Sequence, residues 1–167
     1  MINTSIRRAL VLSSLVLGAT TLFSAKAMAN TSGSVTLNGT VASTLALVIT
    51  TLPEAGALPL NGSTQQIVRV AGLAISTNNE QGYTVTATSG DLTRTGGTPI
   101  AYRVTTTADG GTAPASGGFA VASHTFASSA ANALNTNGRD LYIMYTPAAL
   151  QDPGLYGGTI TVSVINN

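Results

Sequence analysis

The chain has 167 residues, no cysteine, one histidine and only 8% charged residues. The lack of cysteine excludes disulfides, thiol chemistry and cysteine-ligated metal sites. Threonine, valine, isoleucine, serine and glycine are abundant after the first 30 residues, and β-branched residues favour strands over helices.

The first 29 residues have the features of a secretory signal peptide. Arg7 and Arg8 form a positive n-region, a mostly apolar run covers residues 9–23, and residues 27–29 (AMA) match the A-x-A cleavage pattern. The apolar run is shorter than the ~20 residues that a membrane-spanning helix needs. We therefore expect cleavage after Ala29, with export to the periplasm and then to the cell surface.

Without residues 1–29 the chain would keep 138 residues, a length that suits one domain. It would carry four arginines, no lysine and six acidic residues, a formal net charge of −2. This balance offers no basic surface for nucleic acid. We expect residues 30–43 to form an N-terminal extension and residues 44–167 to form the folded domain.

The segment at the start of this shortened chain alternates between apolar and polar residues over an unusual length. Every second position from 35 to 49 lies on one face of an extended chain, and Ser43 interrupts the otherwise apolar or small set. That set is Val35, Leu37, Gly39, Val41, Leu45, Leu47 and Ile49. Because typical strands run only ~5–6 residues, the pattern indicates either one long strand or two strands in series.

Further alternating runs follow, separated by turn residues. We expect a hairpin of residues 66–76 and 83–88, strands over residues 100–105, 119–126 and 141–145, and a last strand from residue 156 almost to residue 167. About seven strands at this spacing predict an all-β fold, specifically an immunoglobulin-like β-sandwich. A β-barrel is the main architectural alternative.

The residue types that support catalysis are sparse. His124 is the only histidine, so a metal site of several His or Cys ligands is not expected. The acidic residues occur singly, mostly in expected turns, and no serine lies in a G-x-S-x-G motif. The five tyrosines lie in or beside expected strands, where packing is their usual role. We expect no enzymatic activity, no metal and no cofactor.

Three segments resemble those of chaperone–usher pilins. Residues 35–41 (VTLNGTV) resemble a donor strand, and residues 74–86 (AISTNNEQGYTVT) resemble a strand-turn-strand of that superfamily. Residues 154–164 (GLYGGTITVSV) are similar to the closing strand of spore coat U-type pilins and colonisation-factor fimbrial subunits. The chain departs from many pilins in having no disulfide, and Asn166 stands where the commonest pilins have a penultimate tyrosine.

The resemblance implies a sandwich that lacks one strand and is completed by donor-strand exchange between identical subunits. A periplasmic chaperone and an outer-membrane usher would be further partners, and the product would be a fimbria with a role in adhesion to host or abiotic surfaces or in biofilm formation. The donor candidates are Val35, Leu37, Gly39, Val41, Leu45 and Leu47. The candidates for the groove and C-terminal strand are Tyr156, Ile160, Val162 and Val164.

Two alternatives stay open at this point. Residues 35–49, or their second half from Leu45, form the first strand of the domain itself rather than a donated one. The protein as a whole is a monomeric secreted or surface β-sandwich that binds carbohydrate or another ligand.

Overall fold

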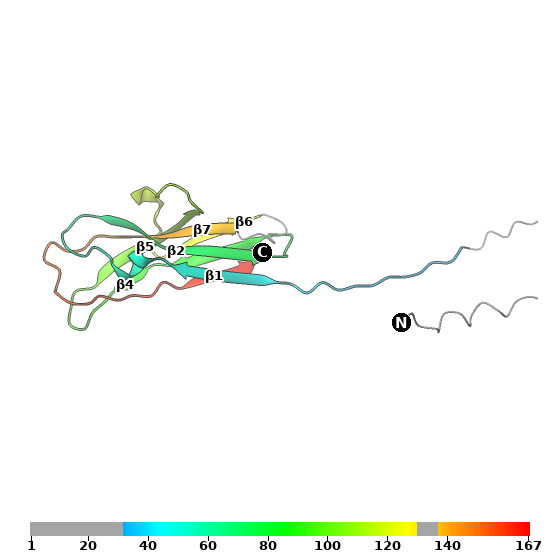
Figure 1. The fold of residues 1–167 in the computed structure, drawn as a ribbon, viewed down its shortest axis with the longest axis horizontal. Helices are drawn as coiled ribbons and strands as arrows, with labels where there is room; N and C mark the ends of the chain where they lie inside the picture. The colour runs from blue at the N-terminus through cyan, green and yellow to red at the C-terminus, as the bar shows by residue number, and fades with distance from the viewer. Residues whose placement is uncertain (1–31, 130–136) are drawn as a thin grey trace, which may run out of the picture. The chain divides into compact units, whose positions relative to one another are not determined.

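The computed structural model describes residues 32–129 and 137–167, which Figure 1 shows as a coloured ribbon. The chain divides into two units, residues 1–39 and 40–167. The described part of the first unit, residues 32–39, contains no helix or strand. The expected signal peptide and its cleavage site lie outside the described residues.

The second unit consists almost entirely of β-strands, which confirms the all-β prediction. The helical elements of the described residues are two 3-10 turns, η2 (Pro53–Gly56) and η3 (Ser116–Gly118), and no helix there is long and apolar enough to cross a membrane. The strands are β1 (Leu45–Thr51), β2 (Gln66–Thr77), β3 (Tyr83–Thr88), β4 (Gly90–Leu92), β5 (Ile100–Ala108), β6 (Ser123–Ser128), β7 (Asn137–Tyr145) and β8 (Val162–Asn166).

These strands form two antiparallel sheets (Figure 1). The larger sheet has the order β1-β2-β7-β5-β4, and the smaller has the order β6-β3-β8. Therefore β1 lies at an edge of the larger sheet, and β8 lies at an edge of the smaller sheet. Each has a single hydrogen-bonded neighbour among the described strands, β2 for β1 and β3 for β8.

The expected hairpin of residues 66–76 and 83–88 is wrong, although both strands exist. β2 pairs with β1 and β7, whereas β3 pairs with β6 and β8, so the turn between β2 and β3 carries the chain from one sheet to the other. Alternation and turn residues mark where strands begin and end, but they do not say which sheet each strand joins.

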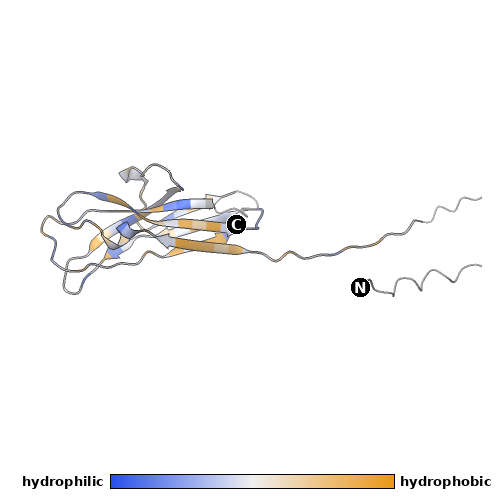
Figure 2. Cartoon of the chain, in the orientation of Figure 1, coloured by the Kyte–Doolittle hydropathy of each residue, from blue (hydrophilic) through white to orange (hydrophobic). Residues whose placement is uncertain are grey.

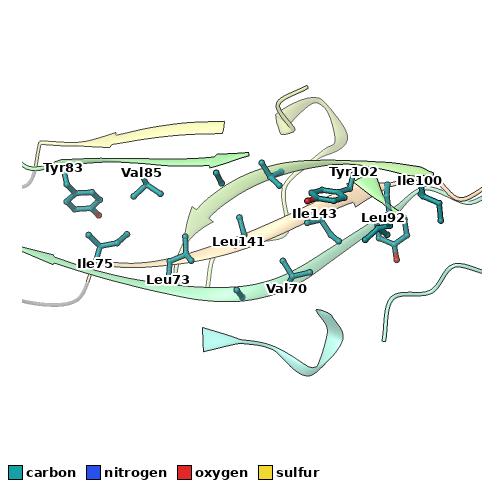
Figure 3. Close-up of a cluster of buried hydrophobic side chains, with 14 residues drawn as sticks. Val70, Leu73, Ile75, Tyr83, Val85, Leu92, Ile100, Tyr102, Leu141 and Ile143 are labelled. Atoms are coloured by element: carbon teal, nitrogen blue, oxygen red, sulfur yellow. The ribbon is translucent and has the colours of Figure 1, made fainter. Parts of the chain in front are cut away.

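The main hydrophobic core lies between the two sheets (Figure 3). In β3, Tyr83, Val85 and Ala87 are buried while Thr84 and Thr86 are partly exposed, as the period-two pattern predicts. In Figure 3, Tyr83 and Val85 face Ile75 of β2 from the opposite sheet. Ile75 and Val104 have no exposed surface at all, so the two sheets hold together mainly by burying apolar area.

β2 contains a β-bulge, and Arg69 at this bulge forms an ion pair with β7. The register of β2 with β7 shifts between Arg69 and Ala71, and the successive residues Val70 and Ala71 are both buried. The Arg69 guanidinium lies 2.5 Å from the Asp140 carboxylate on β7. Asp140 is fully buried and also accepts a hydrogen bond from the Gly110 N–H at 3.0 Å, so its charge is compensated.

Replacing Ile75 with alanine tests the core between the sheets. We expect the free energy of unfolding of residues 44–167, measured by chemical denaturation, to fall by about 2–5 kcal/mol, because the truncation leaves a cavity. Ile165→Ala is the matched control, since the Ile165 side chain is 62% exposed, and it should change the free energy by less than about 0.5 kcal/mol. Equal losses in the two variants would contradict this location of the core.

Candidate functional site

An apolar groove lies between the end of β1, at the edge of one sheet, and the C-terminal segment that leads into β8. Leu45 and Leu47 on β1, and Val162 and Val164 on β8, are only partly buried although all four pack against the main core. Figure 2 shows β1 as one of the strongly hydrophobic strands. Hydrophobic side chains at two facing strand edges therefore remain partly open to solvent in this unit.

The groove has a volume of about 340 Å³ and lies next to η2. Core residues of four strands, β2, β4, β5 and β7, form its floor, among them Val70, Tyr102 and Ile143, and its walls include Ile49, Leu58 and Ile160. This volume lies within the range of ~300–1,000 Å³ that is typical of ligand pockets. The lining is mainly aliphatic, so the cavity suits an apolar side chain rather than a charged ligand.

Hydrogen bonds to the larger sheet hold the wall that precedes β8. The N–H of Thr93 donates to the carbonyl of Gly157 at 2.8 Å, and the Gly157 N–H donates back to Thr93 at 2.9 Å. The Tyr102 hydroxyl donates to the Thr159 carbonyl at 2.8 Å. Burial, and to a smaller extent the Asp91 carboxylate, raises the pKa of Tyr102, so this hydroxyl keeps its proton and remains a donor.

Residue 158 in the same wall is a glycine because its backbone lies close to Asp91 and Leu92. A Cβ atom there would lie 2.9 Å from the Asp91 carbonyl oxygen and 3.1 Å from a methyl group of Leu92. Any larger residue would push the segment away from β4 and change the shape of the groove. Gly158 of the C-terminal motif thus has a structural reason that the sequence pattern alone does not supply.

The expected C-terminal groove residues lie together. Tyr156, Ile160 and Val162 line the cavity, and Val164 continues along β8. Local patterning did not indicate the parts of the groove that come from the middle of the chain, such as Leu58, Val70 and Tyr102. The alternation in residues 100–104 marks Tyr102 as inward-facing, but only the pairing of β5 with β7 brings it beneath the groove.

The expected donor residues fall into two groups. Val35, Leu37 and Val41 are 84%, 88% and 87% exposed, and they lie with Gly39 in a stretch without secondary structure. Leu45 and Leu47 instead belong to β1, where they pair with Thr77 and Ile75 of β2. The second half of the long alternating pattern is therefore the first strand of the domain itself, and only residues 35–41 remain as a donor candidate.

The lone histidine lies among threonines and an arginine. His124 Nε2 is 3.1 Å from the Thr106 hydroxyl, and its Nδ1 is 3.4 Å from the Thr105 hydroxyl. The Thr106 oxygen also accepts a hydrogen bond from Arg139 at 3.0 Å, and the Arg139 guanidinium lies 3.4 Å above the Phe126 ring centroid. In the described residues, no three His, Cys, Asp or Glu side chains group so as to hold a metal ion.

The tyrosines pack as expected from their positions in the sequence. Tyr83, Tyr102, Tyr142 and Tyr145 are buried, and Tyr156 is half-buried in the wall of the groove. Burial raises the pKa of Tyr145 to about 12, and its hydroxyl donates to the Pro59 carbonyl at 3.2 Å. These side chains do not form an exposed aromatic platform of the kind that stacks on sugars.

Comparisons with known protein families, with curated proteins and with solved structures give no significant match to this chain.

Titration of His124 should affect stability. Burial, followed by the Arg139 charge, lowers the pKa of His124 below its ordinary value of about 6.5. The unfolded chain therefore binds this proton more readily than the folded chain, and the stabilising contribution is present above about pH 6.5 and is lost as the pH falls below it.

Chemical denaturation of residues 44–167 between about pH 7 and 5 checks this. We expect the free energy of unfolding to fall more steeply in the parent protein than in His124→Gln, which retains a polar side chain but does not titrate. Parallel slopes for the two proteins would contradict the assignment.

Proposed function

We propose that this chain is the structural subunit of an extracellular pilus or fimbria, polymerises by donor-strand exchange, and acts in adhesion or biofilm formation. The observation that carries the proposal is an apolar groove between β1 and β8, combined with an exposed alternating segment, residues 35–41, that precedes β1.

The strand order supports an immunoglobulin-like sandwich with one strand missing. Immunoglobulin constant domains have sheets ordered A-B-E-D and C-F-G. Here β1-β2-β7-β5 takes the order of the first sheet, and β3-β8 takes the order C-F. The last strand, G, would lie beside F, on the side of β8 that has no neighbour among the described strands. We infer that this position is the place for a donated strand.

The length and pattern of residues 35–41 suit that position. From Ile160 to Asn166 the acceptor segment has seven residues, as does the segment from Val35 to Val41. At 3.3–3.4 Å per residue, both extend over about 20 Å. Val35, Leu37 and Val41 would fill the apolar groove, and Gly39 would allow a close approach of the backbones.

Exposure of both elements in one molecule would favour association. An edge strand with unpaired backbone groups and adjoining apolar side chains is a template for strand addition. A segment of one subunit that fills the groove of the next makes a head-to-tail contact, and contacts of this kind produce filaments unless they close into a ring. A chaperone strand would cover the groove before assembly, and an usher would receive the covered subunit at the outer membrane.

Removal of the extension tests the exchange directly. Residues 30–167 should form polymers after refolding, whereas residues 44–167 should remain monomeric, because the groove is retained but the donor is lost. A synthetic peptide of residues 30–49 should raise the melting temperature of the shortened form. Size-exclusion chromatography, electron microscopy and thermal denaturation provide the measurements, and a peptide with Val35, Leu37 and Val41 replaced by serine is the control.

The proposal fails if both forms remain stable monomers that do not respond to the peptide. That outcome would favour the monomeric ligand-binding alternative. The place to search would then be the second cavity, of about 440 Å³, whose lining includes Gln65, Arg103 and Gln151.

Mixing two defective subunits tests the head-to-tail arrangement. Leu37→Arg should abolish the donor, and Val162→Arg should block the groove, because each introduces a charge that would have to be buried. Neither variant alone should polymerise, but an equimolar mixture should give heterodimers that native mass spectrometry detects. Continued polymerisation of either variant alone would contradict the assigned roles, as would a mixture that remains monomeric.

A further inference from the structure

Asn78 makes three hydrogen bonds to the residues just before β1. Its backbone N–H donates to the Thr44 carbonyl at 3.3 Å, and its side-chain oxygen accepts from the Thr44 N–H at 2.7 Å. Its side-chain NH₂ group donates to the Ala42 carbonyl, also at 2.7 Å. Since Leu45 pairs with Thr77, Asn78 continues the pairing of β2 with β1 beyond the last regular residue pair.

Asn166, at the end of β8, adds a second attachment. Its side-chain NH₂ group donates to the Ser43 hydroxyl at 3.1 Å, and its side-chain oxygen accepts from the Thr77 hydroxyl at 2.7 Å. Residues 42–44 are therefore held in line with β1 by Asn78 and are tied to the end of β8. We call Asn78 and Asn166, together with residues 42–44, the asparagine clasp.

The clasp lies where the chain would have to turn in order to fill its own groove. Ser43 contacts Asn166, so the end of β8, and with it the end of the open strand edge, is only a few residues from Val41 along the chain. Loops of two to five residues are enough to reverse a strand. A segment on so short a connection has an effective concentration in the millimolar range, which would favour closed monomers over polymers.

We propose that the asparagine clasp prevents this self-insertion, so that the groove takes residues 35–41 of a second copy. A reversal at residues 42–44 requires Ala42 and Thr44 to leave the extended conformation in which Asn78 holds them. Both side-chain hydrogen bonds of Asn78 would then break. This inference rests on the proposed function, and it assigns to Asn78 a role in choosing the occupant of the groove.

Asn79 offers a matched control in the same turn. Its side chain accepts from the Gln81 N–H and donates to the Asn167 carbonyl, and among the described residues it makes no hydrogen bond to residues 42–44. Asn78→Ala and Asn79→Ala therefore both remove one asparagine from this turn. Only the first removes side-chain bonds to the residues that precede β1.

The experiment refolds residues 30–167 of the parent protein and of both variants at one low concentration. Size-exclusion chromatography gives the ratio of monomer to polymer, and hydrogen exchange with mass spectrometry gives the protection of residues 35–41 in the monomer. Asn78→Ala should increase the monomer with a protected segment by about tenfold, the change expected for loss of net hydrogen bonding of this size. Asn79→Ala should behave like the parent protein.

The inference is overturned if Asn78→Ala polymerises like the parent and its remaining monomer shows no protection. It is also overturned if residues 44–167 carrying Asn78→Ala no longer bind the peptide of residues 30–49, since Asn78 would then merely support the groove. Failure of the proposed function looks different, because the parent protein itself would not polymerise and its shortened form would not bind the peptide.

Discussion

A β-strand carries hydrogen-bonding groups on both sides, and among the described strands β8 pairs on one side only, with β3. The neighbouring apolar side chains of β1 and β8 are partly buried but remain accessible along the groove. Backbone groups can be satisfied by water, but the apolar surface is covered only by another apolar segment. The proposed assembly follows from this combination of an open strand edge with an open part of the core.

The rest of the unit keeps the groove open and in shape without help from disulfides. The core between the sheets is rigidly packed around Ile75, Val85 and Val104. Tyr102 and Thr93 hold the wall before β8 against the larger sheet. The asparagine clasp holds the opposite end, where β1 begins. In the proposed assembly, these contacts would keep the apolar surface of the groove available to an incoming strand.

The low charge of the chain is consistent with this arrangement. Electrostatic repulsion between subunits would be weak, since four arginines and six acidic residues remain after residue 29. One of the few close ion pairs, Arg69 with Asp140, serves the scaffold rather than an exposed surface. Subunit recognition in the proposed filament would therefore depend on shape and apolar burial and little on charge, and its response to salt would be weak.

The sequence by itself determined the strand-rich class and most strand positions. Period-two alternation is a local property, and in residues 83–88 it gave both the strand and its buried face correctly. The alternating segment before β1 and the C-terminal motif were also visible in the sequence. The alternation by itself left open whether Leu45 and Leu47 continue the segment of residues 35–41 or begin the first strand of the domain, because apolar residues alternate on both sides of Ser43.

Only the tertiary structure decided which sheet each strand joins, and with it the groove. β2 and β3 follow one another along the chain but belong to different sheets, so their local pattern was compatible with a hairpin that does not exist. The groove combines β1, residues from the middle strands and the segment before β8. In the sequence, Asn78 looks like an ordinary turn residue and Asn166 like an ordinary residue near the C-terminus. Their contacts with residues 42–44 arise from pairing between distant segments. Such contacts depend on sheet order, which local patterning does not encode.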